Sequence, residues 1–198
     1  MRKHLSRVMA VLLVLAMALT MLPVVSAAKE RFTATPIDGI PESGQTFVIY
    51  SAPAGGVFSP EASGGAVGVS AASGSEESAN LTVQTGAGAY QAVKNADGTY
   101  YLTCGGQYLT VNSAEKLSFE NEPKSGSSMS SKWKIADAGK DYDGFSIASA
   151  EVKYNNYEIF LEFYTAFKAW TYKPNSDWSI YVFRFFSVDG TADPDNDG

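Results

Sequence analysis

The sequence predicts an all-β fold, because three observations agree. Short runs of β-branched and aromatic residues recur along the chain, and clusters of Gly, Asn, Asp and Pro separate them. No stretch of a dozen residues keeps the periodicity of an amphipathic helix through to a capped end. The expected strands lie at residues 46–50, 81–85, 90–95, 99–104, 107–112, 131–137, 144–149, 158–164 and 179–186.

Turn-favouring residues bound these strands. Gly reaches positive φ without steric cost, Pro fixes φ, and Asn or Asp side chains bond to nearby backbone. Ser- and Gly-rich segments at 70–80 and 124–131 are expected to form surface loops. In chain order the turn clusters are 53–56 after the first strand, 95–98 after the third, 105–106 after the fourth and 141–144 before the seventh.

The spacing of the strands repeats three times. Three units of roughly 50 residues, with four short strands each, predict a β-trefoil, a barrel that no single unit closes by itself. The alternative is an eight-stranded barrel or a sandwich in which the spacing is coincidental. Aromatic-led strands open the units at Phe47, Tyr100 and Phe145, and aromatic-led strands close them at Tyr90, Trp133 and Tyr181, with Trp133 expected in the core.

The first 27 residues have the pattern of a secretory signal peptide. A basic start is followed by an apolar run from Val8 to Leu22, then Pro23 and small residues before a cleavage site at Ala27. A retained membrane anchor is the alternative, since the apolar stretch approaches the length of a spanning helix. We expect a secreted or cell-surface protein with a signal peptide (1–27), an N-terminal lead-in (28–43), a β-trefoil-like module (44–189) and an acidic linker or truncated continuation (190–198).

Composition limits the partners. Without the three basic residues of the signal peptide, the formal net charge changes from −6 to −9. We therefore expect no nucleic-acid partner, and a membrane only through an uncleaved N-terminal segment. Cys104 is the single cysteine, so no intramolecular disulfide forms. Its strand-like surroundings predict a buried or half-buried side chain.

The mature chain is expected to contain no histidine, because the single one, His4, lies in the signal peptide. Histidine is the commonest general base and metal ligand near neutral pH. Without it, Ser-His-Asp, Cys-His and HExxH chemistry is unavailable. We therefore expect no enzyme and no cofactor, with a histidine-independent hydrolase as the catalytic alternative.

Two acidic patterns bear on catalysis and metal binding. Glu158 and Glu162 share a strand face, but four residues of strand separate them by roughly 13 Å, more than the roughly 5 to 9.5 Å between the carboxyl groups of glycosidases. Asp193, Asp195 and Asp197 match the first half of a calcium loop. The chain ends before the bidentate glutamate, so these three are weak metal candidates and a solvated linker is the expected role.

The densest functional pattern is a run of rings between Tyr157 and Tyr172. If Ile159, Leu161 and Phe163 point inward, strand periodicity turns Phe160 and Tyr164 outward together with Glu158 and Glu162. Exposed rings beside carboxylates form a platform that stacks on a sugar or docks a neighbouring domain. A satellite core under the barrel loops is the alternative. The expected ligand-binding residues are Phe160, Glu162, Tyr164, Phe167, Trp170 and Tyr172.

Several short motifs between Gly44 and Val188 resemble a family of β-rich accessory modules. They include "SGQTFVIYSAPAGGVFS", "DGTYYLTCGGQYLTV", "SSKWKIA" and "YEIFLEFYTAFKAWTY". The family occurs in large secreted surface proteins of clostridia-like Gram-positive bacteria, beside metallophosphatase/5'-nucleotidase or endonuclease domains. The pattern matches at 48–50, 106–110, 131–133, 161–164 and Trp170, and departs from the family at Tyr90, where Trp is usual, and at 56–58, where a basic residue and Ala-Leu are usual.

The resemblance implies a trefoil-like companion of a catalytic domain. The nucleotidase activity of such proteins belongs to a separate, histidine-bearing domain, so it does not transfer to this chain. We therefore expect a non-catalytic extracellular binding module for a glycan or another polar ligand. The alternative is a structural docking or spacer domain, truncated from a secreted multidomain hydrolase, whose rings face the catalytic neighbour.

Overall fold

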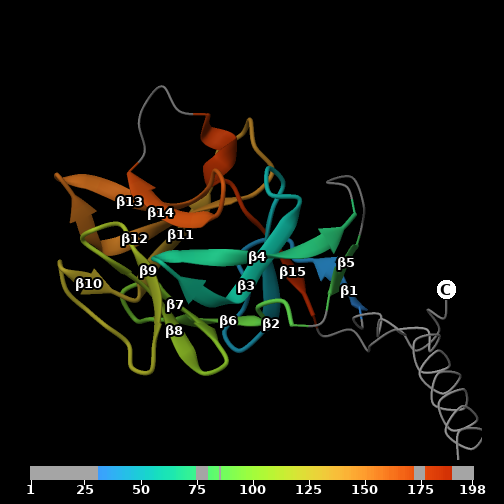
Figure 1. The fold of residues 1–198 in the computed structure, drawn as a ribbon, viewed down its shortest axis with the longest axis horizontal. Helices are drawn as coiled ribbons and strands as arrows, with labels where there is room; N and C mark the ends of the chain where they lie inside the picture. The colour runs from blue at the N-terminus through green and yellow to red at the C-terminus, as the bar shows by residue number, and fades with distance from the viewer. Residues whose placement is uncertain (1–30, 75–79, 85, 172–176, 189–198) are drawn as a thin grey trace, which may run out of the picture.

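The structure is a computed structural model that describes residues 31–74, 80–84, 86–171 and 177–188. Its regular structure is almost entirely β-strand (Figure 1), which confirms the all-β prediction. Among the described residues no helix is long and apolar enough to cross a membrane. The elements are β1 (Arg31–Pro36), β2 (Thr46–Ser51), β3 (Gly56–Ser63), β4 (Ala66–Ser73), β5 (Leu81–Gln84), β6 (Tyr90–Lys94), β7 (Tyr100–Cys104), β8 (Gln107–Asn112), β9 (Leu117–Glu120), β10 (Met129–Ser130), β11 (Lys132–Asp137), β12 (Phe145–Tyr154), β13 (Tyr157–Phe163), β14 (Phe167–Thr171), the 3₁₀ helix η1 (Trp178–Tyr181) and β15 (Arg184–Ser187).

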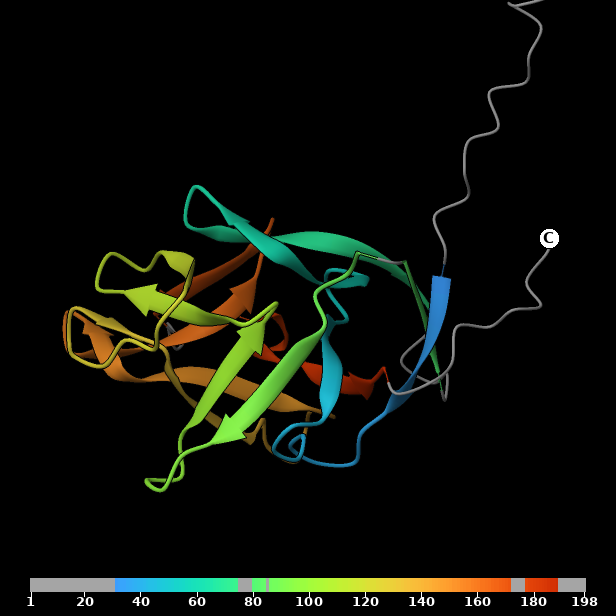
Figure 2. The same ribbon diagram turned by 90° about the horizontal axis from the view of Figure 1, so that it is seen from below.

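The strands form a closed antiparallel barrel. Eleven strands pair in the order β2-β15-β1-β5-β4-β14-β13-β12-β11-β7-β6, and β6 returns to β2. Closure gives each of these strands a hydrogen-bonded neighbour on both sides, which removes the free edges that invite aggregation. β1 and β5 lie at one end of the molecule, and the β12–β13 turn lies at the other (Figures 1 and 2).

A shorter ring of six strands lies within this barrel. It runs β2-β6-β7-β11-β12, passes through an isolated bridge between Phe145 of β12 and Phe183, the residue before β15, and closes from β15 to β2. The opening residue of each sequence unit pairs with an aromatic residue of a closing segment. The three pairs are Phe47 with Tyr90, Tyr100 with Trp133, and Phe145 with Phe183. The prediction that Tyr181 begins the third closing strand is wrong, since Tyr181 lies in η1.

Three hairpins, β3–β4, β8–β9 and β13–β14, leave this ring and meet one another. Leu117 N donates to Gly65 O at 2.9 Å, which joins the second hairpin to the first. Thr171 N donates to Glu115 Oε1 at 2.9 Å and joins the third to the second. Phe167 pairs with Val67, so β14 lies beside β4. Each hairpin therefore contacts both others.

The main core is rich in aromatic rings. Phe58 contacts Tyr90, Phe167 and Phe183, with ring centroids 6.0, 3.9 and 5.6 Å away. Trp133 is fully buried, and its Nε1 donates to Leu109 O at 2.9 Å, which confirms the prediction that it belongs to the core. Burial of the indole with its N–H satisfied combines a large apolar area with no unpaired polar group.

A second, smaller core lies on the other side of β2. Phe47 and Ile49 point into the main core, whereas Val48 and Tyr50 point into the second one, as the period of two requires. A ring of β1, β5, β4, β3, β2 and β15 encloses it. The segment expected as a lead-in (28–43) thus supplies β1, whose Ala34 is fully buried in this core.

The sequence-based strand prediction fails where the local signal is weak. β3 and β4 are rich in Gly, Ala and Ser, which have low strand propensity, yet they pair with each other over much of their length. β4 also takes in the start of the expected loop at 70–80. The predicted strand at 179–186 divides into η1 and β15, because Asp177 Oδ1 accepts from Ser179 N at 2.9 Å and caps η1.

Glu151 in β12 fastens the Ser-rich segment before β11. Its carboxylate accepts hydrogen bonds from Ser130 Oγ at 2.7 Å and from Ser125 Oγ and Gly126 N at 2.9 Å, and lies 3.2 Å from Lys132 Nζ. Partial burial raises the pKa of this carboxyl, but the hydrogen bonds outweigh burial and hold the pKa at about 2. The expected loop at 124–131 is therefore tied to the barrel wall, and it contains β10.

We expect Glu151→Gln to reduce the free energy of unfolding by about 1–2 kcal/mol at neutral pH, because hydrogen bonds to a charged group are stronger than neutral ones. The folded-state pKa of about 2 lies below the ordinary value of 4.5, so this contribution is present above about pH 4.5 and is lost as the pH falls towards 2. Urea unfolding of both proteins at neutral pH and near pH 2.5 should show the difference shrinking.

Glu158→Gln is the matched control, since Glu158 forms an exposed ion pair with Lys134 at 3.2 Å. Exposed pairs contribute little, so this variant should unfold nearly like the parent protein. An equal loss in the two variants would show that Glu151 does not fasten the segment.

Candidate functional site: an aromatic surface and a hairpin groove

The β13–β14 hairpin follows the predicted alternation in part. Ile159 and Leu161 are fully buried, and Phe163 packs against the main core, as predicted for the inward set. Phe160 lies on the opposite face, directly across from Trp170 of β14. The period of two thus fixes which side chains leave the core, but it does not fix which of them reach solvent.

The ring of Phe160 is partly covered by η1. Trp178 and Tyr181 pack edge-on against it, with centroids 5.5 and 6.0 Å away. Trp178 Nε1 donates to Ala138 O at 3.1 Å, which anchors η1 to the loop after β11. Phe160 is therefore half-buried, and its ring packs against η1 instead of being fully exposed for stacking on a ligand.

The expectation that Glu162 points into solvent beside the rings is wrong. It is only 7% exposed and accepts a hydrogen bond from Tyr181. Burial raises the pKa of its carboxyl, and the nearby Glu115 adds to this, while the Tyr181 bond and Lys168 act in the opposite direction. Because Glu162 is buried beneath the surface, a ligand on the hairpin face does not reach its carboxylate.

Phe167 also needs correction as an expected ligand-binding residue. Its side chain is fully buried, and its ring contacts those of Phe58, Phe163 and Phe183. Phe167 faces inward because it lies on the same side of β14 as Ala169, opposite to Trp170. Here the satellite-core alternative describes the residue better, although it belongs to the main core itself.

Most of the rings that do reach solvent lie on the third hairpin and at the β12–β13 turn before it. Tyr164, in the turn between β13 and β14, is 76% exposed, and Trp170 is 41% exposed. In the described ranges one other exposed ring, Tyr142, lies outside this region. Tyr172 lies outside the described residues. Tyr154 and Tyr157 pair with each other at the start of β13, the end opposite to Tyr164. We call the following two residues the third-hairpin surface: Tyr164 and Trp170.

The acidic candidates do not assemble into a metal site in the described part of the chain. No group of three or more His, Cys, Asp or Glu side chains lies close enough to hold a metal ion there. Asp193, Asp195 and Asp197 lie outside the described residues. Asp141 and Asp143 border a cavity of about 280 Å³, where Asp143 pairs with Arg184 at 3.5 Å.

Cys104 ends β7 and is buried, as predicted. Burial raises the pKa of its thiol, and a hydrogen bond from the Ala89 backbone partly opposes the rise. A raised pKa keeps the thiol protonated and unreactive at neutral pH. The residue therefore acts as a small core side chain.

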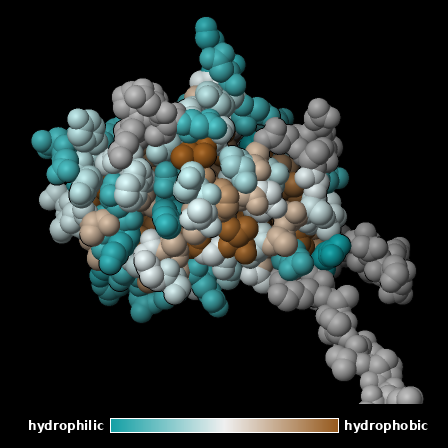
Figure 3. Space-filling view, turned by 45° about the horizontal axis from the view of Figure 1, so that its top comes forward, coloured by the Kyte–Doolittle hydropathy of each residue, from teal (hydrophilic) through white to brown (hydrophobic). Residues whose placement is uncertain are grey.

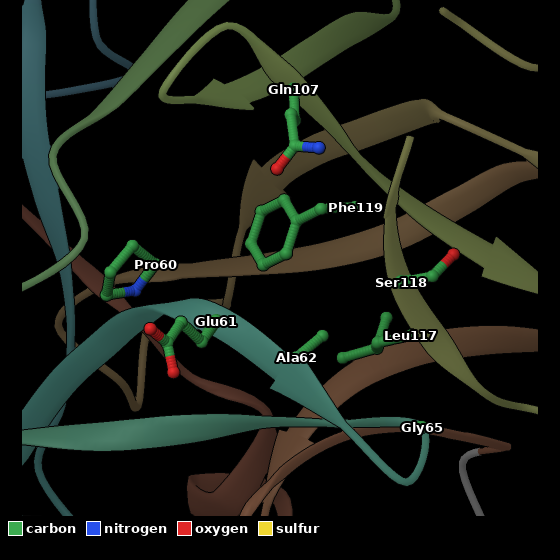
Figure 4. A pocket seen from close by; sticks show the side chains of 8 residues that line it. All are labelled: Pro60, Glu61, Ala62, Gly65, Gln107, Leu117, Ser118 and Phe119. Carbon is green, nitrogen blue, oxygen red and sulfur yellow. The ribbon is translucent and has the colours of Figure 1, made fainter. Parts of the chain in front are cut away.

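A groove between the first and second hairpins was not predicted from the sequence. It has a volume of about 550 Å³ and opens to solvent between β3 and β9 (Figure 4). Its walls come from segments about fifty residues apart, so no local pattern in the sequence reveals it. We call it the hairpin groove, and its lining residues are Pro60, Glu61, Ala62, Gly65, Gln107, Leu117, Ser118 and Phe119.

Comparisons with known proteins give no relative for this chain. No protein-family model matches it, and neither a curated protein nor a solved structure does. The family resemblance carried by the short motifs thus stays a prediction, and the function has to be argued from the surface and the groove.

Proposed function

We propose that the protein is a non-catalytic extracellular module that binds glycans, with the third-hairpin surface as its contact face. The observation that carries this proposal is the pair of exposed rings there, with Trp170 directly across from half-buried Phe160 and Tyr164 in the turn that follows β13. A sugar ring has an apolar C–H face that stacks on Trp or Tyr, and these side chains supply area at low entropic cost.

The proposal includes a β-trefoil architecture. Its support is the six-stranded ring, the three hairpins that leave it, and the three equivalent aromatic pairs between opening and closing segments. β1 and β5 are additions to that plan, since they enclose the second core outside the ring.

A polar ligand suits this surface better than a docking domain. Strongly apolar side chains emerge only in small separate areas on the face that Figure 3 presents. A stable protein interface usually contains a contiguous apolar centre, whereas isolated Trp and Tyr rings among polar residues suit sugars. The alternative, a docking or spacer domain truncated from a multidomain hydrolase, is one of the outcomes of the test below.

The sequence supports the proposed extracellular location and the proposed class of partner. The signal-peptide pattern supports a secreted or cell-surface location, where polysaccharides are the abundant polar polymers. The acidic balance of the chain disfavours nucleic acid as a partner. Catalysis is not part of the proposal, because Glu162 is buried and Glu158 is paired with Lys134, which leaves no exposed carboxylate pair on this hairpin.

We expect Trp170→Ala to abolish retention on the polysaccharide that the protein prefers in a panel of cell-wall and host glycans. One stacked ring contributes on the order of 1 kcal/mol beyond its area, so a single module binds in the micromolar to millimolar range and losing its central ring is sufficient. The measurement is affinity electrophoresis or a glycan array with the full chain.

Tyr142→Ala is the control, because Tyr142 is an exposed ring in the loop between β11 and β12 and does not belong to the third-hairpin surface. It should leave retention unchanged, and both variants should melt close to the parent protein. Unchanged retention of Trp170→Ala would remove this surface as the site. Absence of retention on every glycan, with capture of a second protein domain through Trp170, would favour the docking role.

A further inference from the structure

We propose that the hairpin groove is a second binding site, built for one neutral saccharide unit and separate from the third-hairpin surface. The inference shares only its ligand class with the proposed function. The groove is concave, whereas the third-hairpin surface is a set of exposed rings. Its volume of about 550 Å³ lies within the range of small-molecule sites.

The groove has an aromatic wall that is fixed in place. Phe119 of β9 is half-buried, and its ring packs against that of Tyr90, with 6.3 Å between centroids. Tyr90 is fully buried, and its hydroxyl donates to Ser59 O at 2.8 Å, next to the Pro60 of the groove. A ring supported from behind does not have to be ordered by the ligand, which lowers the cost of binding.

Hydrogen-bonding groups stand on both sides of this ring. Figure 4 shows the Gln107 amide on one side of Phe119 and the Glu61 carboxylate on the other. Gln107 Nε2 donates to Asn121 Oδ1 at 2.9 Å, which orients the amide and leaves its oxygen available. Within the described residues, the Glu61 carboxylate has no hydrogen bond or ion pair of its own. An apolar face between two polar edges matches the shape of a pyranose ring.

The charges of the groove favour a neutral ligand over an anionic one. Glu61 is the only charged side chain among the lining residues, and Ser118 Oγ donates to a further carboxylate, Glu120, at 2.9 Å. A phosphate or a uronic acid would meet repulsion from these groups, since no lining side chain is basic. A sugar hydroxyl instead donates to the Glu61 carboxylate in a charge-assisted hydrogen bond.

The test is a titration of the full chain with maltotetraose, cellotetraose and chitotetraose. Binding is monitored by NMR through the chemical shifts of the backbone amides. One of the three probes should shift the amides of residues 61–62 and 117–119. Glu61→Gln keeps the shape of an exposed side chain, and Phe119→Leu keeps much of the apolar volume while removing the ring. Each should weaken that binding about tenfold, with circular dichroism confirming the native fold.

Two controls separate this site from its surroundings. Lys116 packs its aliphatic chain beside Gly65 without lining the groove, so Lys116→Ala should bind like the parent protein. Trp170→Ala should also keep the groove shifts. The inference is overturned if no probe shifts these amides at millimolar concentration, or if Glu61→Gln and Phe119→Leu bind normally. Retention that still depends on Trp170 would then leave the proposed function standing.

Discussion

Phe167→Ala is expected to lower the free energy of unfolding by about 3–5 kcal/mol, the range for a large ring removed from a packed core. Phe167 is fully buried, and the centroid of its ring is 3.9 Å from that of Phe58 and 5.0 Å from that of Phe163. It also lies where β14 pairs with β4, so its loss opens a cavity between the first and third hairpins. Urea unfolding followed by circular dichroism measures the effect.

Tyr164→Ala provides the comparison, since Tyr164 lies three residues earlier and is the most exposed ring of the third-hairpin surface. Surface substitutions of this kind change stability by less than about 0.5 kcal/mol. A small effect at Phe167, similar to that at Tyr164, would contradict the core assignment and restore Phe167 as an expected ligand-binding residue.

Trp133→Ala is expected to be at least as damaging, by about 4–5 kcal/mol. The substitution removes the largest fully buried side chain, and it leaves the carbonyl oxygen of Leu109 without the indole N–H that donates to it at 2.9 Å. The cavity and the unpaired buried carbonyl both add to the loss. Because Trp133 joins β11 to β8, we expect the whole barrel to unfold at lower urea concentration.

Trp133→Phe separates the two contributions. It keeps most of the ring volume and removes the hydrogen bond, so about 1–3 kcal/mol of the loss should remain. In the parent protein, the tryptophan emission should contain a component that iodide does not quench, and this component should disappear in Trp133→Phe. Complete quenching in the parent protein would show that Trp133 is exposed and that the closing strand is misassigned.

The amino-acid sequence by itself determined the all-β class and the inward or outward sense of many strand residues. Turn residues stop the chain after a few residues of strand, and alternation along a strand sends Ile159 and Leu161 one way and Phe160 the other. The aromatic spacing also located the opening residues Phe47, Tyr100 and Phe145, because the same pairing position recurs in each unit.

Only the tertiary structure decided which outward residues reach solvent. Glu162 leaves the core face of β13 as alternation predicts, yet η1, which lies more than a dozen residues later, brings Tyr181 against it. Local periodicity carries no information about such distant coverage, so the sequence placed Glu162 in the binding platform. Trp170 lies on the same hairpin and stays exposed.

Strands with weak propensity and sites built from separate hairpins also required the tertiary structure. β3 and β4 hold few residues that prefer strands, and β1 lies in a segment without clear alternation, but pairing and burial of Ala34, Val57 and Val67 stabilise them in place. The hairpin groove needs Glu61 and Phe119 to meet from different units. Contacts between residues far apart in the chain decide such features, because burial free energy depends on neighbours that local sequence does not specify.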